Sequence, residues 1–116
     1  MQHRAYLMRL KKEHTQDYVE IHRKENLWAS IVDGLKQSKI TKQIIVRHGT
    51  DLILFEEAED LKAVYAANNT SPETCRWDAL MDSWIENYPK FNAVKGDVDI
   101  TELPVVFYYE NGKLLH

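Results

Sequence analysis

The segment between residues 40 and 57 is the sequence feature that most constrains the fold of this chain. Residues 40–47 are rich in β-branched side chains, and residues 51–57 form a second apolar run. Both compositions are typical of β-strands. Gly49 lies in the short connection between them, and a glycine adopts a positive φ without steric penalty. The pattern predicts a β-hairpin, so the chain contains antiparallel β-structure at its centre.

Strands and helices alternate around this hairpin. Residues 3–11 carry apolar side chains on both alternating faces, which is typical of a strand buried on both sides. Residues 13–38 change to apolar spacings of three and four, which predicts one long helix. After the hairpin, Asp60 is placed to cap a short helix over residues 61–69.

The last part of the chain predicts a helix, a loop and a final strand. Ser71 followed by Pro72 is typical of a helix start, and Pro89 closes this second helical region. Residues 90–99 are polar and predict a loop, whereas residues 103–110 predict the last strand. The Asn68–Asn69 pair is expected to end the short helix before it.

The predicted order is therefore strand, long helix, strand, strand, helices, strand. This is the split βαβ pattern of ferredoxin-like folds. We expect an α+β fold that forms a single ferredoxin-like domain over residues 1–116, with helices on one face of an antiparallel sheet. Because the strands are apolar on both sides, the other face also needs cover, and a second copy of the chain would supply it.

Composition excludes several classes of function. The formal net charge is −3 and both signs are interspersed, so the basic footprint of a nucleic-acid-binding protein is absent. No apolar stretch approaches the ~20 residues needed to cross a bilayer, and the first residues do not resemble a signal peptide. The single cysteine, Cys75, cannot form an internal disulfide, so we expect a cytoplasmic protein.

Tyr18 and His22 are the best candidates for chemistry. Their spacing of four residues stacks a phenol and an imidazole on one face of the predicted helix. The later tract CRWDALM adds Trp77. A group that titrates near neutrality, a hydroxyl and flat aromatic surfaces suit proton transfer on a sugar. The alternatives are a chance pairing of Tyr18 with His22 and simple core packing for Trp77.

The other titratable groups predict neither a metal nor a cofactor site. Four histidines lack the spacing of metal ligands: His3, His14, His48 and His116. No glycine-rich phosphate-binding loop is present. Four acids lie between a strand end and a helix start: Glu56, Glu57, Glu59 and Asp60. Acids at such a position favour the helix dipole, so we interpret them as a solvated edge rather than a catalytic pair.

The order and spacing of several segments resemble the L-rhamnose mutarotase family. The segments are RAYLMRL, Tyr18 with His22, Trp28, LILFEEAE and CRWDALM. Members of this family are small ferredoxin-like proteins of the dimeric α/β-barrel type, and they interconvert sugar anomers without metal or cofactor. The resemblance implies a mutarotase acting on a 6-deoxy sugar such as L-rhamnose or L-fucose, and a homodimer.

The resemblance also implies roles for individual residues. His22 matches the family's proton donor, Tyr18 matches its active-site tyrosine, and Trp77 matches the first of two adjacent sugar-binding tryptophans. The second tryptophan is Asp78 here, which could accept hydrogen bonds from sugar hydroxyls. A tyrosine that contacts sugar from the family's second strand falls near Gln43.

The segment from His22 to Trp28 departs from the family pattern, because it lacks a proline and is longer. About two extra residues would rotate a continuous helix by about 200°. A bulge or break must therefore lie between His22 and Trp28 if both keep their family positions.

Two other classes of function share this architecture: a non-catalytic small-ligand-binding dimer and a cofactor-free monooxygenase. The side chains of Tyr18, His22 and Trp77 discriminate between them. Convergence on one polar-mouthed pocket favours the mutarotase. A His22 side chain that faces bulk water, together with a Trp77 side chain buried in the core, favours the non-catalytic binding protein. A larger and more apolar pocket favours the monooxygenase.

Overall fold

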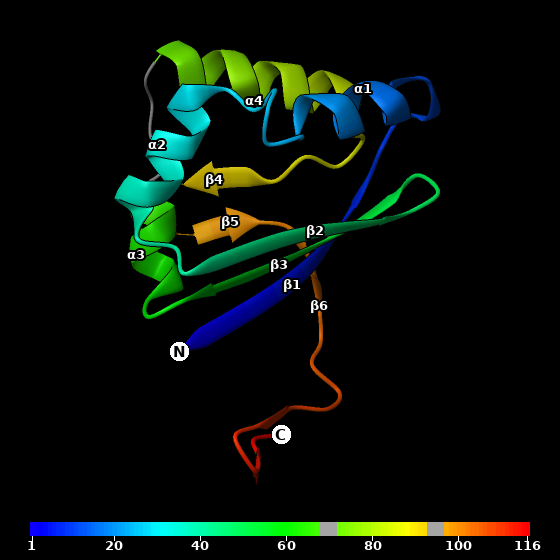
Figure 1. The fold of residues 1–116 in the computed structure, drawn as a ribbon. Helices are drawn as coiled ribbons and strands as arrows, with labels where there is room; N and C mark the ends of the chain where they lie inside the picture. Colours follow the sequence, from blue (N-terminus) through cyan, green and yellow to red (C-terminus); the bar gives the residue numbers. More distant parts are fainter. Residues whose placement is uncertain (68–71, 93–96) are drawn as a thin grey trace.

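The computed structural model describes residues 1–67, 72–92 and 97–116. Its centre is an antiparallel four-stranded sheet in the order β2-β3-β1-β6 (Figure 1). The strands are β1 (Gln2–Arg9), β2 (Lys42–His48), β3 (Asp51–Ala58) and β6 (Thr101–Leu103). Helices lie between β1 and β2 and again between β3 and β6, so the predicted ferredoxin-like α+β class is confirmed.

The β2–β3 hairpin forms as the sequence predicts. Gly49 lies in its turn with φ of 60°, a value that a residue without Cβ adopts freely. Side chains of β3 alternate between the two faces of the sheet. Those that point toward the helices are buried: Leu52, Leu54, Glu56 and Ala58. This register places one carboxylate among the side chains of the core face.

The predicted helix over residues 13–38 is not continuous. A short 3-10 turn, η1 (Lys12–His14), leads into α1 (Thr15–Ile21), and after a turn the chain continues as α2 (Ala29–Ser38). The Asn26 side chain donates a hydrogen bond to the Glu20 carbonyl at 2.9 Å, beside the Arg23 backbone N–H at 3.3 Å, and this ties the turn to the end of α1. The expectation of one long helix is therefore wrong, whereas the expected break between His22 and Trp28 is confirmed.

Two further helices follow the hairpin. In α3 (Leu61–Ala66), the Asp60 carboxylate accepts a hydrogen bond from the Ala63 backbone N–H at 3.2 Å, which confirms the predicted N-cap. The second helix is α4 (Pro72–Trp84). Its end is fixed by a backbone hydrogen bond from Lys11 to the Trp84 carbonyl at 2.8 Å. The helix boundaries predicted at Asn68–Asn69 and Ser71 lie outside the described residues.

The C-terminal third differs from its prediction. Residues 90–99, expected to form a loop, contribute the paired strands β4 (Lys90–Asn92) and β5 (Asp97–Asp99). The prediction of a strand over residues 103–110 is wrong: β6 precedes this range and stops at Leu103, because Pro104 has no N–H to donate to the ladder. The chain then leaves the sheet and closes in a small hairpin of β7 (Tyr109–Glu110) and β8 (Lys113–Leu114) (Figure 1).

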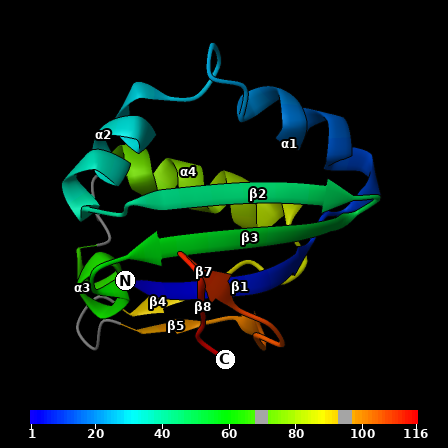
Figure 2. The same ribbon diagram turned by 60° about the horizontal axis from the view of Figure 1, so that its bottom comes forward.

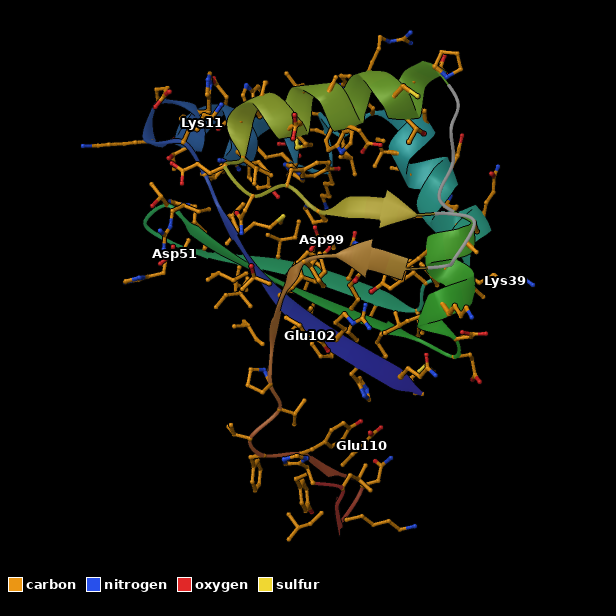
Figure 3. The ribbon with its side chains drawn as sticks, turned by 180° about the vertical axis from the view of Figure 1, so that it is seen from behind. Lys11, Lys39, Asp51, Asp99, Glu102 and Glu110 are labelled. Carbon is orange, nitrogen blue, oxygen red and sulfur yellow. The ribbon has the colours of Figure 1, made fainter. Side chains whose placement is uncertain are left out.

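Helices α1, α2 and α4 form a layer over one face of the sheet (Figure 1). Side chains fill the space between the two layers (Figure 3). The buried apolar cluster there comprises Tyr6, Met8, Leu10, Tyr18, Leu52, Leu54, Trp77, Met81 and Ile85. Within the described residues, no helix combines the length and the apolar character that a bilayer crossing requires.

The opposite surface of the sheet, here called the outer face, has no helix over it (Figure 2). The central side chains of this face on the hairpin are apolar, and Lys42, His48 and Glu57 lie toward its ends; the apolar ones are Ile44, Val46, Ile53 and Phe55. Ile44 and Val46 are 48% and 54% exposed, although residues of this type are usually buried. The sheet is thus apolar on both sides, as the sequence predicts, but helices cover only one of them.

Candidate active site

Tyr18 and His22 lie at the C-terminal end of α1 with their rings against each other. The ring centroids are 4.0 Å apart and the ring planes are tilted by 32°. Tyr18 is buried, and this desolvation raises the pKa of its hydroxyl well above the ordinary value. The hydroxyl therefore stays protonated near neutral pH and can donate a hydrogen bond.

His22 satisfies one of the open carbonyls that any helix end leaves behind. Its Nδ1 lies 2.7 Å from the backbone carbonyl oxygen of Tyr18. A carbonyl oxygen only accepts, so Nδ1 carries the hydrogen and donates it. Burial lowers the pKa of His22, and the hydrogen bond to the Tyr18 carbonyl opposes this shift in part. In the neutral ring the lone pair is then on Nε2, which can act as a base.

Trp77 reaches the same place from α4. Its ring centroid lies 5.2 Å from that of His22, with the planes at 70°, and 5.2 Å from that of Trp28, with the planes at 75°. Both are edge-to-face contacts, which aromatic rings favour. Trp28 and Trp84 are half-buried and pack against the core. The structure therefore brings the Trp77 ring of α4 against the rings of His22 and Trp28, which come from a much earlier part of the chain.

Tyr18, His22 and Trp77 line one hollow of about 140 Å³ between the helices and the sheet. A second hollow of about 170 Å³ adjoins it. The two share five wall residues: Ile31, Leu35, Gln43, Trp77 and Tyr88. Each hollow is several times larger than the roughly 15 Å³ that one water needs. We treat them as one pocket, and call the part around His22 the His22 end.

The other end of the pocket holds a buried carboxylate. Glu56 is 3% exposed; Tyr65 Oη donates to its Oε1 at 2.8 Å, and Gln43 Nε2 donates to its Oε2 at 3.3 Å. Burial raises the pKa of Glu56, while the hydrogen bonds from Tyr65 and Gln43 and the charge of Arg4 lower it. We call this group, formed by Glu56, Gln43 and Tyr65, the Glu56 end.

The interpretation of the acidic cluster as a solvated edge is wrong for Glu56. It holds for Glu59 and Asp60, which are exposed. Glu57 lies on the outer side of the sheet, 3.0 Å from His3 Nε2. The alternation along LILFEEA was the signal that could have identified Glu56, because it shares the core-facing register of Leu54.

The two positions that depart from the family pattern both line the pocket. Asp78 accepts a hydrogen bond from Tyr88 Oη at 2.7 Å. Burial raises the pKa of Asp78, and the Tyr88 hydrogen bond opposes the shift. Gln43 lines both hollows and connects them. Polar groups thus stand at the two positions where the resemblance implies aromatic ones.

No group of three or more His, Cys, Asp or Glu side chains in residues 1–67, 72–92 and 97–116 is arranged to hold a metal ion. Fold and pocket together define a ferredoxin-like protein with an internal site whose wall combines aliphatic and aromatic side chains with an imidazole and two carboxylates. A family model described as L-rhamnose mutarotase matches residues 3–109, so the chain belongs to the L-rhamnose mutarotase family. This is a family of mutarotases, which are carbohydrate epimerases, and the predicted enzyme class is confirmed.

One solved structure supports the fold. It is the crystal structure of an L-rhamnose mutarotase from Formosa agariphila, with a TM-score of 0.67 and 21% sequence identity. The match covers 95% of this chain and 100% of that one. No curated protein has a sequence that matches this chain.

Proposed function

We propose that the protein interconverts the α and β anomers of a 6-deoxy aldose, with L-rhamnose as the first candidate and L-fucose as the second. Membership of the L-rhamnose mutarotase family supports the reaction. The observation that carries the proposal is the meeting of Tyr18, His22 and Trp77 around one hollow.

In the proposed mechanism, His22 moves the proton. Neutral Nε2 takes the proton from the anomeric hydroxyl and returns it to the ring oxygen, so that the bond between C1 and the ring oxygen breaks and an aldehyde forms. Both oxygens are bonded to the same carbon, and one nitrogen can therefore serve both. Rotation about the C1–C2 bond and the reverse proton transfer close the ring as the other anomer. A positioned acid or base contributes roughly 10²–10⁴ in rate.

The neighbouring groups bind and orient the sugar. Trp77 lies against the apolar C–H face of the ring, and the Tyr18 hydroxyl donates a hydrogen bond to a sugar oxygen. Asp78 accepts from a sugar hydroxyl. The acidic and amide groups of the pocket wall do not suit the apolar aromatic substrate of a monooxygenase, which makes that alternative the weaker one.

Exchange NMR on anomeric protons tests the proposal directly. The exchange rate between α and β signals is measured for a panel of aldoses with and without the protein. Wild type is expected to accelerate exchange of at least one 6-deoxy sugar. Equal rates with and without protein, for every sugar in the panel, would reject the mutarotase and favour a non-catalytic binding protein.

We further propose that two copies pair through the outer face. The face exposes Ile44, Val46 and Ile53, and the C-terminal segment exposes Val106 and Phe107 by 86% and 70%. Exposed apolar surface of this kind marks a protein interface. In sedimentation velocity, wild type should be a dimer and Val46→Glu a monomer. Lys36→Glu, a charge change at an exposed residue of α2, is the control and should stay dimeric.

The cytoplasmic location remains a prediction. It rests on the use of a single cysteine, Cys75, which lies exposed on α4. Fractionation of cells that express the tagged protein would test it.

A further inference from the structure

The mechanism above leaves one buried titratable group unused. Glu56 lies on the core face of β3, in the register of Leu52 and Leu54. An apolar side chain at this position would pack against the core without any polar partner. A buried carboxylate instead requires donors, and here Tyr65 and Gln43 supply them.

Glu56 and the catalytic imidazole line different hollows of the pocket. Glu56 lines the hollow that contains Asp78, His22 lines the adjoining hollow, and Trp77 and Gln43 belong to the walls of both. In a pyranose, C3 and C4 lie opposite the ring oxygen and C1. A sugar that presents its ring oxygen and C1 to His22 therefore presents its C3 and C4 hydroxyls toward Glu56.

Resting on the proposed function, we propose that Glu56, held by Tyr65 and Gln43, is a specificity-determining residue that accepts hydrogen bonds from the C3 and C4 hydroxyls of the aldose. An ionised carboxylate offers about four acceptor positions. Among the described residues, Tyr65 and Gln43 occupy one position on each oxygen. The remaining positions suit hydroxyl donors, and hydrogen bonds to a charged acceptor are stronger than those between neutral groups.

The consequence is selection at C4. L-Rhamnose and L-fucose carry their C4 hydroxyl on opposite sides of the ring, so a fixed carboxylate cannot bind both equally well. A site built to bind a hydroxyl also rejects an analogue that lacks it, because the buried polar group is then left unpaired.

Binding of L-rhamnose, L-fucose and their 4-deoxy counterparts tests this assignment. Affinities are measured by NMR titration for wild type, Glu56→Gln and the control Glu57→Gln, whose carboxylate lies on the outer side of the same strand. We expect Glu56→Gln to weaken binding of the preferred sugar by roughly tenfold to a hundredfold. Its 4-deoxy counterpart keeps only the C3 hydroxyl as a partner of Glu56, so its binding should weaken by a clearly smaller factor, and Glu57→Gln should match wild type.

The ratio of the two affinities within one protein sample does not depend on the folded fraction, so partial unfolding of Glu56→Gln cannot imitate the result. Equal losses for both sugars, or no loss for either, would overturn the assignment. A loss in kcat with unchanged binding would also overturn it and make Glu56 an acid–base group.

The proposed function can fail independently. A wild type that binds sugar with the Glu56-dependent preference but never accelerates anomer exchange would reject the mutarotase and keep the hydroxyl-binding site. Acceleration together with a preserved preference in Glu56→Gln would reject only the assignment of Glu56.

Discussion

The two ends of the pocket are built from different parts of the fold and respond to the same burial in opposite ways. The His22 end is formed where α1 stops, and its imidazole is fixed by a backbone carbonyl. The Glu56 end is formed by strands β2 and β3 with α3, and its carboxylate is fixed by side-chain donors. Burial lowers the pKa of His22 and raises that of Glu56, and in both cases it favours the neutral form.

The difference indicates that the His22 end serves proton transfer and the Glu56 end serves binding of the sugar. A neutral imidazole with a free lone pair is suited to take and return a proton near pH 7. A carboxylate that already accepts two hydrogen bonds is suited to hold hydroxyl groups in place. We therefore expect changes at the His22 end to act on the rate of the chemical step, and changes at the Glu56 end to act on binding.

The largest expected effect is at the His22 end. His22→Ala removes the group that moves the proton, so kcat for anomer exchange should fall by roughly 10²–10⁴. Binding of the sugar, measured by NMR titration, should change by less than about tenfold. His48→Ala, an exposed histidine at the end of β2, is the matched control. An unchanged kcat in His22→Ala would remove the distinction between the two ends.

The second prediction uses the pH dependence of stability, for which the signs at the two ends are opposite. The folded-state pKa of His22 lies below the ordinary 6.5, so its stabilising contribution is complete above that pH and is lost as the pH falls toward the folded-state pKa. The folded-state pKa of Glu56 lies above the ordinary 4.5. Its contribution is complete below that pH and is lost as the pH rises through the raised pKa.

Glu56→Gln removes the contribution of Glu56 to the pH dependence of stability, because the amide does not titrate. Between about pH 5 and pH 8, the variant should lose less stability than wild type, because the folded-state pKa of Glu56 is raised. Urea denaturation at both pH values measures this difference. Glu57→Gln should retain the wild-type pH dependence, and a Glu56→Gln variant that does the same would contradict the buried-carboxylate account.

The smallest expected effect comes from the helix that positions Tyr65. Asp60→Ala removes the N-cap of α3 and should cost about 1 kcal/mol of stability. Because Tyr65 holds Glu56, sugar binding should weaken by a few fold while kcat stays near its wild-type value. Glu59→Ala, the exposed neighbour, is the control for both measurements. A loss confined to kcat would show that the two ends are not separable.

The sequence predicted the parts of the fold that local patterns determine. The hairpin, the cap at Asp60 and the order of the main elements follow from residue spacing and turn chemistry. The pairing of β4 with β5 was missed, because these strands are short and polar and are defined by their contact with each other. The stop of β6 at Leu103 could have been predicted from Pro104, which has no N–H to continue the ladder.

The site was predicted in part. The i, i+4 spacing of Tyr18 and His22 places them side by side, and their meeting with Trp77 required the resemblance to a family, since α1 and α4 are distant in sequence. Glu56 was missed because its acidic neighbours suggested a solvated edge. Which acid of a cluster points inward depends on strand register, and register is settled by pairing with β1 and β2.

The turn that separates α1 from α2 has a consequence for how this chain tolerates inserted residues. Residues inserted into a continuous helix would rotate everything beyond them, whereas residues inserted into this turn lengthen an exposed connection and leave both helices in register with the sheet. The length of the turn can therefore change while His22 before it and Trp28 after it stay in the same position relative to the sheet. A variant with one further glycine inserted after Lys24 should fold and retain its anomer-exchange rate.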